Sequence, residues 1–275
     1  MPVDPLLRKL NIDVPSQPHV LMKLSLMMAE DDLNIQAMSD LISNDMSLAS
    51  AVLRAVNSSM YGLKGRVESV HQATTYLGMS EVTAITFKFG LRAAFPPVAD
   101  LEVLWKRATN RGFLMSRMAQ SLNIDAWAAH SAGLFEECGK AVLYRHSPYH
   151  YPAILRAAKA DAELVQLERH AFGVSHEALG AALCETWGLS ATAVNSVRHH
   201  ITVQTQGKIP VYVGKRGACA LSAVAHTLMH SAKRVDETVR RMAPQAQIDV
   251  NQMLYAAHVA DMQMREAMER EKVAH

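Results

Sequence analysis

Histidine is the residue type in this sequence with the widest chemical scope, because 13 imidazoles offer both metal ligands and acid–base groups. His176 follows Ser175 at a predicted helix start and shares an apolar face with Leu179. The adjacent pair His199-His200 ends the next predicted helix, so imidazoles from two successive helices could converge. A single histidine on an apolar face is more often a satisfied core residue than a ligand, and we expect this of His176.

Two adjacent acids, Glu136 and Glu137, are the carboxylates that could join these histidines. Adjacent residues on a helix point about 100° apart, so at most one of the two can face a core squarely. A buried carboxylate also needs a cation or a hydrogen-bond donor, or else it takes up a proton. We therefore expect Glu137 to lie outward and Glu136 to cap a helix or pair locally.

Other histidine and cysteine patterns are weaker. His226 and His230 have the spacing of two zinc ligands on one helix face, but no H-E-x-x-H glutamate or nearby third ligand accompanies them. Cys138, Cys184 and Cys219 are far apart and form no C-x-x-C motif, so neither a disulfide framework nor a zinc knuckle is indicated. We expect Cys138 and Cys184 to be inert core thiols.

Phosphate-binding motifs are absent from the sequence, and its DNA-binding pattern is weak. Neither a P-loop, nor G-x-G-x-x-G, nor a G-x-S-x-G nucleophile elbow is present. The segment from Ile35 to Val56 has the helix and turn lengths of a helix-turn-helix. A recognition helix reads bases with Arg, Lys, Asn or Gln, but the second helix here has Arg54 and otherwise serines and apolar residues. With 28 basic and 26 acidic residues the formal net charge is only +2, and basic pairs are scattered. Nucleic-acid binding is therefore an unfavoured alternative.

The elements that must position these residues are predicted to be helices. Apolar residues make up 49% of the chain and recur at helical spacing in segment after segment, with Ser, Asp or Gly at the ends. The short stretch from Lys208 to Gly214 contains Pro210, and we interpret it as a loop rather than a strand. The fold class is therefore predicted to be all-α, a multi-helix bundle.

Proline-rich and glycine-rich breaks suggest how the chain is divided. We predict an N-terminal lead over residues 1–14, a helical lobe over 15–97 that ends at Pro96-Pro97, a second lobe over 98–203, and a loop with C-terminal helices over 204–275 packed on the same unit. The first ten residues lack a secretory pattern, and no uncharged apolar run reaches 18 residues. We expect a cytoplasmic protein without membrane contact.

The sequence resembles the HDOD domain, the HD-related output domain of bacterial signalling proteins, over about residues 15–203. The most specific match is LRAVNSSMYG at Leu53 to Gly62, which is similar to the family's NS-x-x-[YF]-G signature, and FGVSHEALGAALCETWGLS matches further downstream. The positions that carry the resemblance, which we expect to be structural, are Asp45, Asn57, Ser58, Tyr61, Gly62, Gly78 and Trp187.

The resemblance implies an HD-domain-like helical core, related to phosphohydrolases that hold a metal with scattered histidines and a central His-Asp pair. GLFEECGKAVL stands where the superfamily has GLLHDIGKLVL, so the central pair is replaced by the two glutamates. The early histidine is also replaced, with Arg107 nearby, and the late aspartate falls near His226. The residues left to line a vestigial pocket, or to hold any metal, are Glu136, Glu137, His176, His199 and His200, with Arg107 beside them.

Three functions follow as hypotheses. The first is a non-enzymatic regulatory domain without a cofactor, acting through contacts with signalling proteins or through a small molecule, such as a nucleotide, in the degenerate pocket. The second is a metal-dependent phosphohydrolase or phosphodiesterase with a substituted site. The third is a nucleic-acid-binding regulator. Neither a complete ligand set nor a phosphate-facing Lys/Arg cluster is evident from the sequence, which favours the first.

Overall fold

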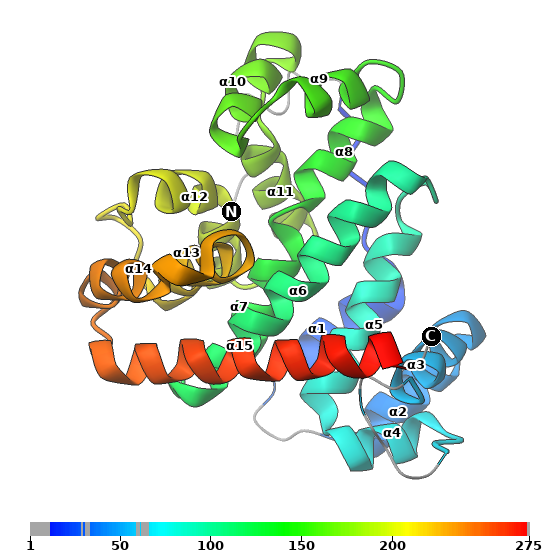
Figure 1. The fold of residues 1–275 in the computed structure, drawn as a ribbon. Coiled ribbons are helices and arrows are strands. Elements are labelled where there is room, and N and C mark those ends of the chain that lie inside the picture. The colour runs from blue at the N-terminus through cyan, green and yellow to red at the C-terminus, as the bar shows by residue number, and fades with distance from the viewer. Residues whose placement is uncertain (1–11, 29, 31–33, 59–60, 62–65, 274–275) are drawn as a thin grey trace. The chain divides into compact units, whose positions relative to one another are not determined.

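The computed structural model describes residues 12–28, 30, 34–58, 61 and 66–273. Throughout these ranges the regular structure is helical and contains no strand, as predicted (Figure 1). The stretch from Lys208 to Gly214 is a turn-containing loop rather than a strand. The all-α prediction is therefore confirmed.

The chain divides into two compact units. The smaller unit comprises Gln17–Ala94 and Met262–His275, and the larger unit comprises Met1–Ser16 and Phe95–Asp261. By this division the stretch 204–275 is split, because residues up to 261 belong to the larger unit and the rest are grouped with the smaller one.

The smaller unit is built from short helices with polar caps. Asn34, Asp45 and Ser69 each accept hydrogen bonds from backbone N–H groups in the first turn of the helix that follows. Leu21, Leu24, Met38, Ile42 and Val52 are completely buried in its core. Its helices are α1 (His19–Met27), α2 (Ile35–Ser43), α3 (Met46–Val56), α4 (Val70–Leu77) and α5 (Met79–Ala93).

The signature residues of this unit support the backbone. Asn57 donates to the carbonyl oxygens of Leu53 (2.9 Å) and Val67 (2.8 Å) and accepts from the Val67 N–H (2.8 Å), so it ties the end of α3 to the chain ten residues later. The Ser58 hydroxyl donates to a carbonyl of α3 at 2.6 Å, and the Tyr61 hydroxyl to Glu81 at 3.1 Å.

The signature includes two glycines, Gly78 and Gly62, and the structure describes the first of them. Gly78 joins α4 to α5 with φ of +84°, a backbone conformation that side chains with a Cβ rarely adopt. Gly62 lies outside the described residues.

The larger unit holds the remaining helices, except for the part of α15 from Met262 onward, which is grouped with the smaller unit. α6 packs along α7 and α13, while α11 lies between α8 and α12 (Figure 1). The helix α14 was not predicted, because its few apolar residues are separated by charged ones. The elements are α6 (Ala99–Ser121), α7 (Ala126–Phe135), α8 (Cys138–His146), α9 (Tyr151–Ala157), α10 (Asp161–Phe172), α11 (His176–Thr186), α12 (Ala191–Gln206), α13 (Gly217–Ser231), the 3-10 turn Ala232–Arg234, α14 (Val235–Met242), the 3-10 turn Pro244–Ala246 and α15 (Val250–Val273).

A close approach between α8 and α11 positions the candidate site. A Cβ at Gly139 would clash with the backbone carbonyl of His176 and the backbone nitrogen of Gly180, so only glycine lets the two helices meet. Nearby, the Trp187 indole is buried edge-on against Phe135, with ring centroids 5.5 Å apart, and donates to the Pro15 carbonyl at 2.9 Å. The starts of α8 and α11 are thereby held together.

Candidate functional site

The two adjacent glutamates lie at the junction of α7 and α8. α7 ends at Phe135 and α8 begins at Cys138, so Glu136 and Glu137 occupy the break between two helices. Their exposed fractions are 0% and 2%. The expectation that Glu137 lies outward and Glu136 merely caps or pairs locally is wrong. The 100° separation assumes one continuous helix, and cations from another helix offset the burial cost.

Glu137 is surrounded by three cations. Arg107 Nη2 and Lys140 Nζ each lie 3.0 Å from its Oε2, and Arg111 Nη1 lies 2.9 Å from its Oε1. Arg107 and Arg111 are one turn apart on α6, and Lys140 is in the first turn of α8. Burial by itself would raise the pKa of Glu137, but these cations outweigh it and hold the pKa well below its usual value.

Glu136 has a different environment. Its Oε2 lies 3.2 Å from Arg111 Nε and accepts from Gln204 Nε2 at 3.0 Å, and the same amide reaches Ser222 Oγ at 3.1 Å. Within the described residues its Oε1 is buried without a hydrogen-bond partner. Burial raises the pKa of Glu136 to about 6, against the opposing effect of Arg111. One arginine thus joins two carboxylates of unequal acidity.

His176 is buried in a hydrogen-bonded chain that the sequence analysis did not predict. Its Nδ1 and its backbone nitrogen both lie 2.7 Å from Glu168 Oε2, and the Tyr151 hydroxyl donates to Glu168 Oε1 at 2.5 Å. Because the carboxylate accepts, the network assigns the Nδ1 proton to His176. Its Nε2 is buried without a partner among the described residues. His176 is therefore a core residue whose position is set by Glu168.

The adjacent histidines of α12 separate. The His200 ring lies 5.5 Å from the His176 ring, and its Nδ1 donates to the Val197 carbonyl at 2.6 Å. Burial, then the nearby His176, lowers the pKa of His200 to about 3. His199 is only half-buried and lies edge-on to Tyr212, with ring centroids 5.5 Å apart. The structure thus brings His200, but not His199, to His176.

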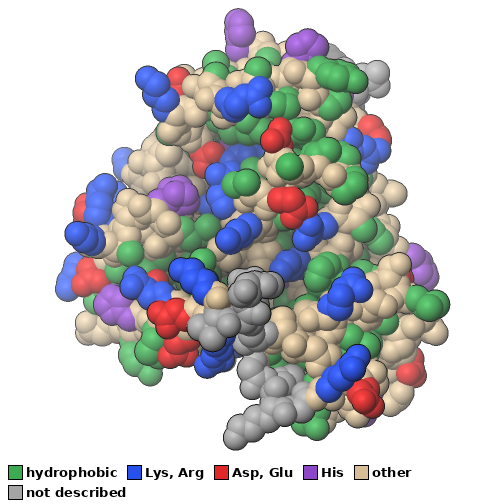
Figure 2. All heavy atoms as spheres, turned by 45° about the vertical axis from the view of Figure 1, so that its right-hand side comes forward, with side chains coloured by type: hydrophobic (Ala, Val, Ile, Leu, Met, Phe, Trp, Pro, Cys, Tyr) green, Lys and Arg blue, Asp and Glu red, His purple; other side chains and the backbone are tan. Residues whose placement is uncertain are grey.

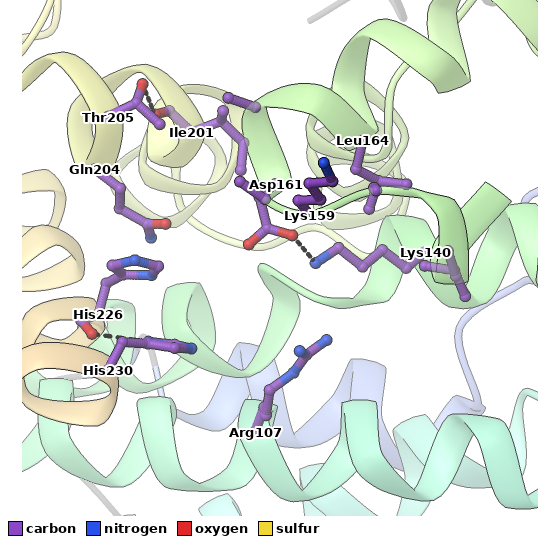
Figure 3. A pocket seen from close by; sticks show the side chains of 14 residues that line it. Arg107, Lys140, Lys159, Asp161, Leu164, Ile201, Gln204, Thr205, His226 and His230 are labelled. Atoms are coloured by element: carbon purple, nitrogen blue, oxygen red, sulfur yellow. Dashed lines mark hydrogen bonds and ion pairs between the residues drawn. The ribbon is translucent and has the colours of Figure 1, made fainter.

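A pocket of about 430 Å³ opens beside the acidic pair in the larger unit. Figure 3 shows Arg107 directed from α6 towards the ion pair between Lys140 and Asp161, whose atoms are 2.7 Å apart. Across the pocket, His226 and His230 stack with ring centroids 4.4 Å apart. Burial, then His230, lowers the pKa of His226 to about 4, so this imidazole is neutral at pH 7. The other polar lining residues are Lys159, Gln204 and Thr205.

The pocket corrects one inference from the sequence. Arg107, Lys140 and Lys159 come from α6, α8 and the α9–α10 connection, so a Lys/Arg cluster does face a cavity. The sequence contains no run of basic residues that would indicate this cluster, because the three positions span 53 residues. Arg111 was missed for the same reason. Two local signals could have indicated these cations. Arg111 lies one turn from Arg107, and Lys140 lies three residues from Glu137.

The residues present do not fit the metal that the HD-like fold implies. Both oxygens of Glu137 are engaged by cations, and His199 lies apart from His176 and His200. In the part of the chain that the structure describes, no group of three His, Cys, Asp or Glu side chains is placed to hold a metal ion.

The cysteines and the surface add little chemistry. Cys138, Cys184 and Cys219 are buried, and burial raises all their thiol pKa values. Basic and acidic side chains are interspersed on the face seen in Figure 2, and on α3 the exposed residues are Met46, Ser47, Ser50 and Arg54. None of the described helices combines the length and the apolar character needed to cross a membrane.

Comparisons with known proteins agree with this architecture. The chain is 24% identical over 196 residues to an uncharacterized protein of Treponema pallidum (strain Nichols), and the match covers 68% of this chain but only 37% of that protein. The chain therefore spans about a third of the length of this curated relative.

Three solved structures share the fold. An HDOD domain protein with unknown function from Geobacter sulfurreducens has a TM-score of 0.72 at 17% identity, covering 95% of this chain and 94% of that one. A Shewanella amazonensis SB2B protein named "Putative phosphohydrolase" has 0.70 at 20%, covering 95% and 97%. A Marinobacter aquaeolei VT8 protein named "Putative signal transduction protein" has 0.72 at 21%, covering 97% and 62%.

The family model of the HDOD domain matches residues 14–203, the stretch that contains the signature residues, the acidic pair and the histidines of α11 and α12. This chain belongs to the HDOD domain family.

Proposed function

We propose that this protein is a non-enzymatic regulatory module that acts through protein contacts or through a small ligand bound beside the buried acidic pair. The observation that carries the proposal is the set of cations around Glu137. Arg107, Arg111 and Lys140 occupy both carboxylate oxygens at 2.9 to 3.0 Å, where a hydrolytic centre needs carboxylate lone pairs for a metal.

Electrostatics makes replacement of these cations by a metal costly. A divalent ion at Glu137 would have to displace Lys140 or Arg111, whose exposed fractions are 1% and 2%. Each displaced cation would then be left buried near a second positive charge, and breaking a buried ion pair typically costs about 3–5 kcal/mol. The cluster is thus a neutralised structural core that supports the wall of a pocket.

The names of the structural neighbours leave two functions in view. One neighbour is named for signal transduction and another for phosphohydrolysis, and at this level of identity both support the fold alone. The cations around the acidic pair favour the regulatory function for this chain. A metal-dependent phosphohydrolase is the competing function, and the experiment below distinguishes the two.

Metal analysis and hydrolysis assays on the purified full chain test the proposal. We expect substoichiometric Zn, Mn and Fe after purification, and no turnover of nucleotides or cyclic dinucleotides when Mg²⁺ or Mn²⁺ is added. The proposal would be overturned by stoichiometric metal together with turnover that disappears in Glu136→Gln and His176→Asn. His170→Asn, an exposed change, is the matched control and must retain any such turnover for it to be assigned to this site.

A further inference from the structure

We propose that the pocket beside the acidic pair binds the phosphoryl group of a small phosphorylated molecule without hydrolysing it. This inference rests on the proposed function for the absence of hydrolysis, but the binding itself stands on the geometry of the pocket. The volume of about 430 Å³ is within the range of small-ligand sites.

The cations of the pocket have unused capacity. Lys159 lines the pocket, is exposed, and has no ion-pair partner among the described residues. Arg107 uses its Nη2 to pair with Glu137, and its side chain is 37% exposed. Its Nε is buried without a hydrogen-bond partner in the described part of the chain. Both side chains can therefore donate to an anion without breaking the pairs that hold the core together.

The charges around the pocket balance, and Lys159 is the cation that lies outside the ion pairs of the described residues. Arg107, Arg111 and Lys140 pair with Glu136, Glu137 and Asp161, and the Glu163 carboxylate accepts from the Lys159 backbone N–H at 2.8 Å. Asp161 also lines the pocket, but its carboxylate is paired with Lys140 at 2.7 Å. An incoming anion would therefore be bound by Lys159 and by the partly exposed Arg107, which both line the cavity.

Neutral donors complete the wall. His226 Nδ1 is buried without a partner among the described residues, and the neighbouring His230 uses its own Nδ1 on the His226 carbonyl at 2.9 Å. Residues Ala160 to Ala162, also in the lining, form the start of α10, whose first N–H groups have no acceptor within the helix. Donors therefore approach from α6 and α10, and a neutral imidazole nitrogen approaches from α13. This arrangement suits the three terminal oxygens of a phosphoryl group better than a planar carboxylate.

Calorimetric titration of the full chain with inorganic pyrophosphate at low ionic strength tests this site. We expect saturable binding that weakens as salt is added. Lys159→Glu and Arg107→Gln should each weaken binding by about tenfold or more, because each removes a charged donor from the pocket. Lys215→Glu carries the same charge reversal as Lys159→Glu on an exposed loop residue outside the lining, and it should bind as the unmodified chain does.

The outcomes separate this inference from the proposed function. Absence of pyrophosphate binding, or equal weakening in Lys215→Glu and Lys159→Glu, would overturn the binding site and leave the regulatory proposal standing. Release of inorganic phosphate during the titration, followed by ³¹P NMR, would overturn the non-hydrolytic part of the inference together with the regulatory proposal. Circular dichroism of every variant confirms that a loss of binding is not a loss of fold.

Discussion

The larger unit buries carboxylates in two ways. At the α7–α8 junction, Glu136 and Glu137 are compensated by Arg107, Arg111 and Lys140. On α10, Glu168 is also completely buried, but it is bound by a tyrosine hydroxyl and by the ring and backbone N–H of His176 at the start of α11. Both sites compensate carboxylates that would otherwise be costly to bury, although Glu136 Oε1 has no hydrogen-bond partner among the described residues.

The difference lies in what each arrangement leaves available. The hydrogen-bonded chain at Glu168 is closed, since its donors are at 0% exposure and serve to orient His176. The ion-pair cluster extends to a pocket, because Arg107 is partly exposed and Lys140 continues to Asp161 on the pocket wall. Formal charges can act on a ligand from a distance, whereas neutral donors act only at contact. The ion-pair cluster is therefore the one suited to recognition.

Arg111→Met should produce the largest loss of stability. Methionine fills much of the arginine volume but leaves Glu136 and Glu137 without their shared cation, and such an uncompensated buried charge costs about 3–5 kcal/mol. Urea unfolding measures the loss. Arg107→Met, which removes a partly exposed partner, should cost at most about 1 kcal/mol. Equal losses of unfolding free energy in Arg111→Met and Arg107→Met would contradict the prediction that the buried arginine contributes more stability than the partly exposed one.

Glu168→Gln tests whether the second site depends on its acceptors. A glutamine amide can present only one acceptor oxygen, so one of the donors now bound by Glu168 is left buried and unsatisfied, at a cost of about 1–3 kcal/mol. Tyr151→Phe removes one donor and leaves the carboxylate with two, so its loss should be smaller, about 1 kcal/mol. Urea unfolding midpoints of both variants check the order, and the reverse order would contradict the assignment of donors.

His200→Asn should reduce the acid sensitivity of the fold. The pKa of His200 is about 3 in the fold, so the unfolded chain binds its proton first as the pH falls below 6.5. This linkage removes roughly 1–2 kcal/mol of stability between pH 6.5 and 5, and the asparagine amide can keep the bond to Val197 without titrating.

Urea midpoints of the wild-type chain and His200→Asn across this pH range check the prediction. His170→Asn, an exposed control, should follow the wild-type curve. His226, whose pKa is lowered to about 4, acts in the same direction over this range, whereas Glu136, whose pKa is raised to about 6, acts in the opposite direction. The His200→Asn curve should therefore fall less steeply than the wild-type curve towards pH 5. Identical curves for wild type and His200→Asn would show that His200 is not held neutral.

Local sequence patterns were sufficient to predict most of the helices and most of the signature residues. Helix-spaced apolar residues and caps such as Ser69, Asp125 and Ser190 act within one or two turns, so the sequence alone reveals them. Asp161 is an aspartate at a helix start, a residue type that favours capping, but its carboxylate does not cap α10 and pairs with Lys140 instead. A contact 21 residues away overrode a local preference at this position.

The candidate site was predictable only in part. Glu136, Glu137, His176 and His200 were named from residue type and helical spacing, and the resemblance to a family then assigned them to one pocket. In the structure all four are buried in the larger unit. Their partners Arg111, Lys140 and Glu168 were not named, because nothing in an isolated helix shows which charged residues turn inward. Burial of a charge is decided by the partner it meets across helices.

By itself, the sequence determined the all-α fold, the family and the structural signature around Asn57, since each of these is a property of neighbouring residues or of a contiguous motif. The tertiary structure alone decided that both glutamates are buried and that cations from α6 and α8 hold them. It also decided that Lys159 and His226 share a pocket with these cations. These outcomes depend on which helices pack together, because electrostatic compensation is set by distances between residues far apart in the chain.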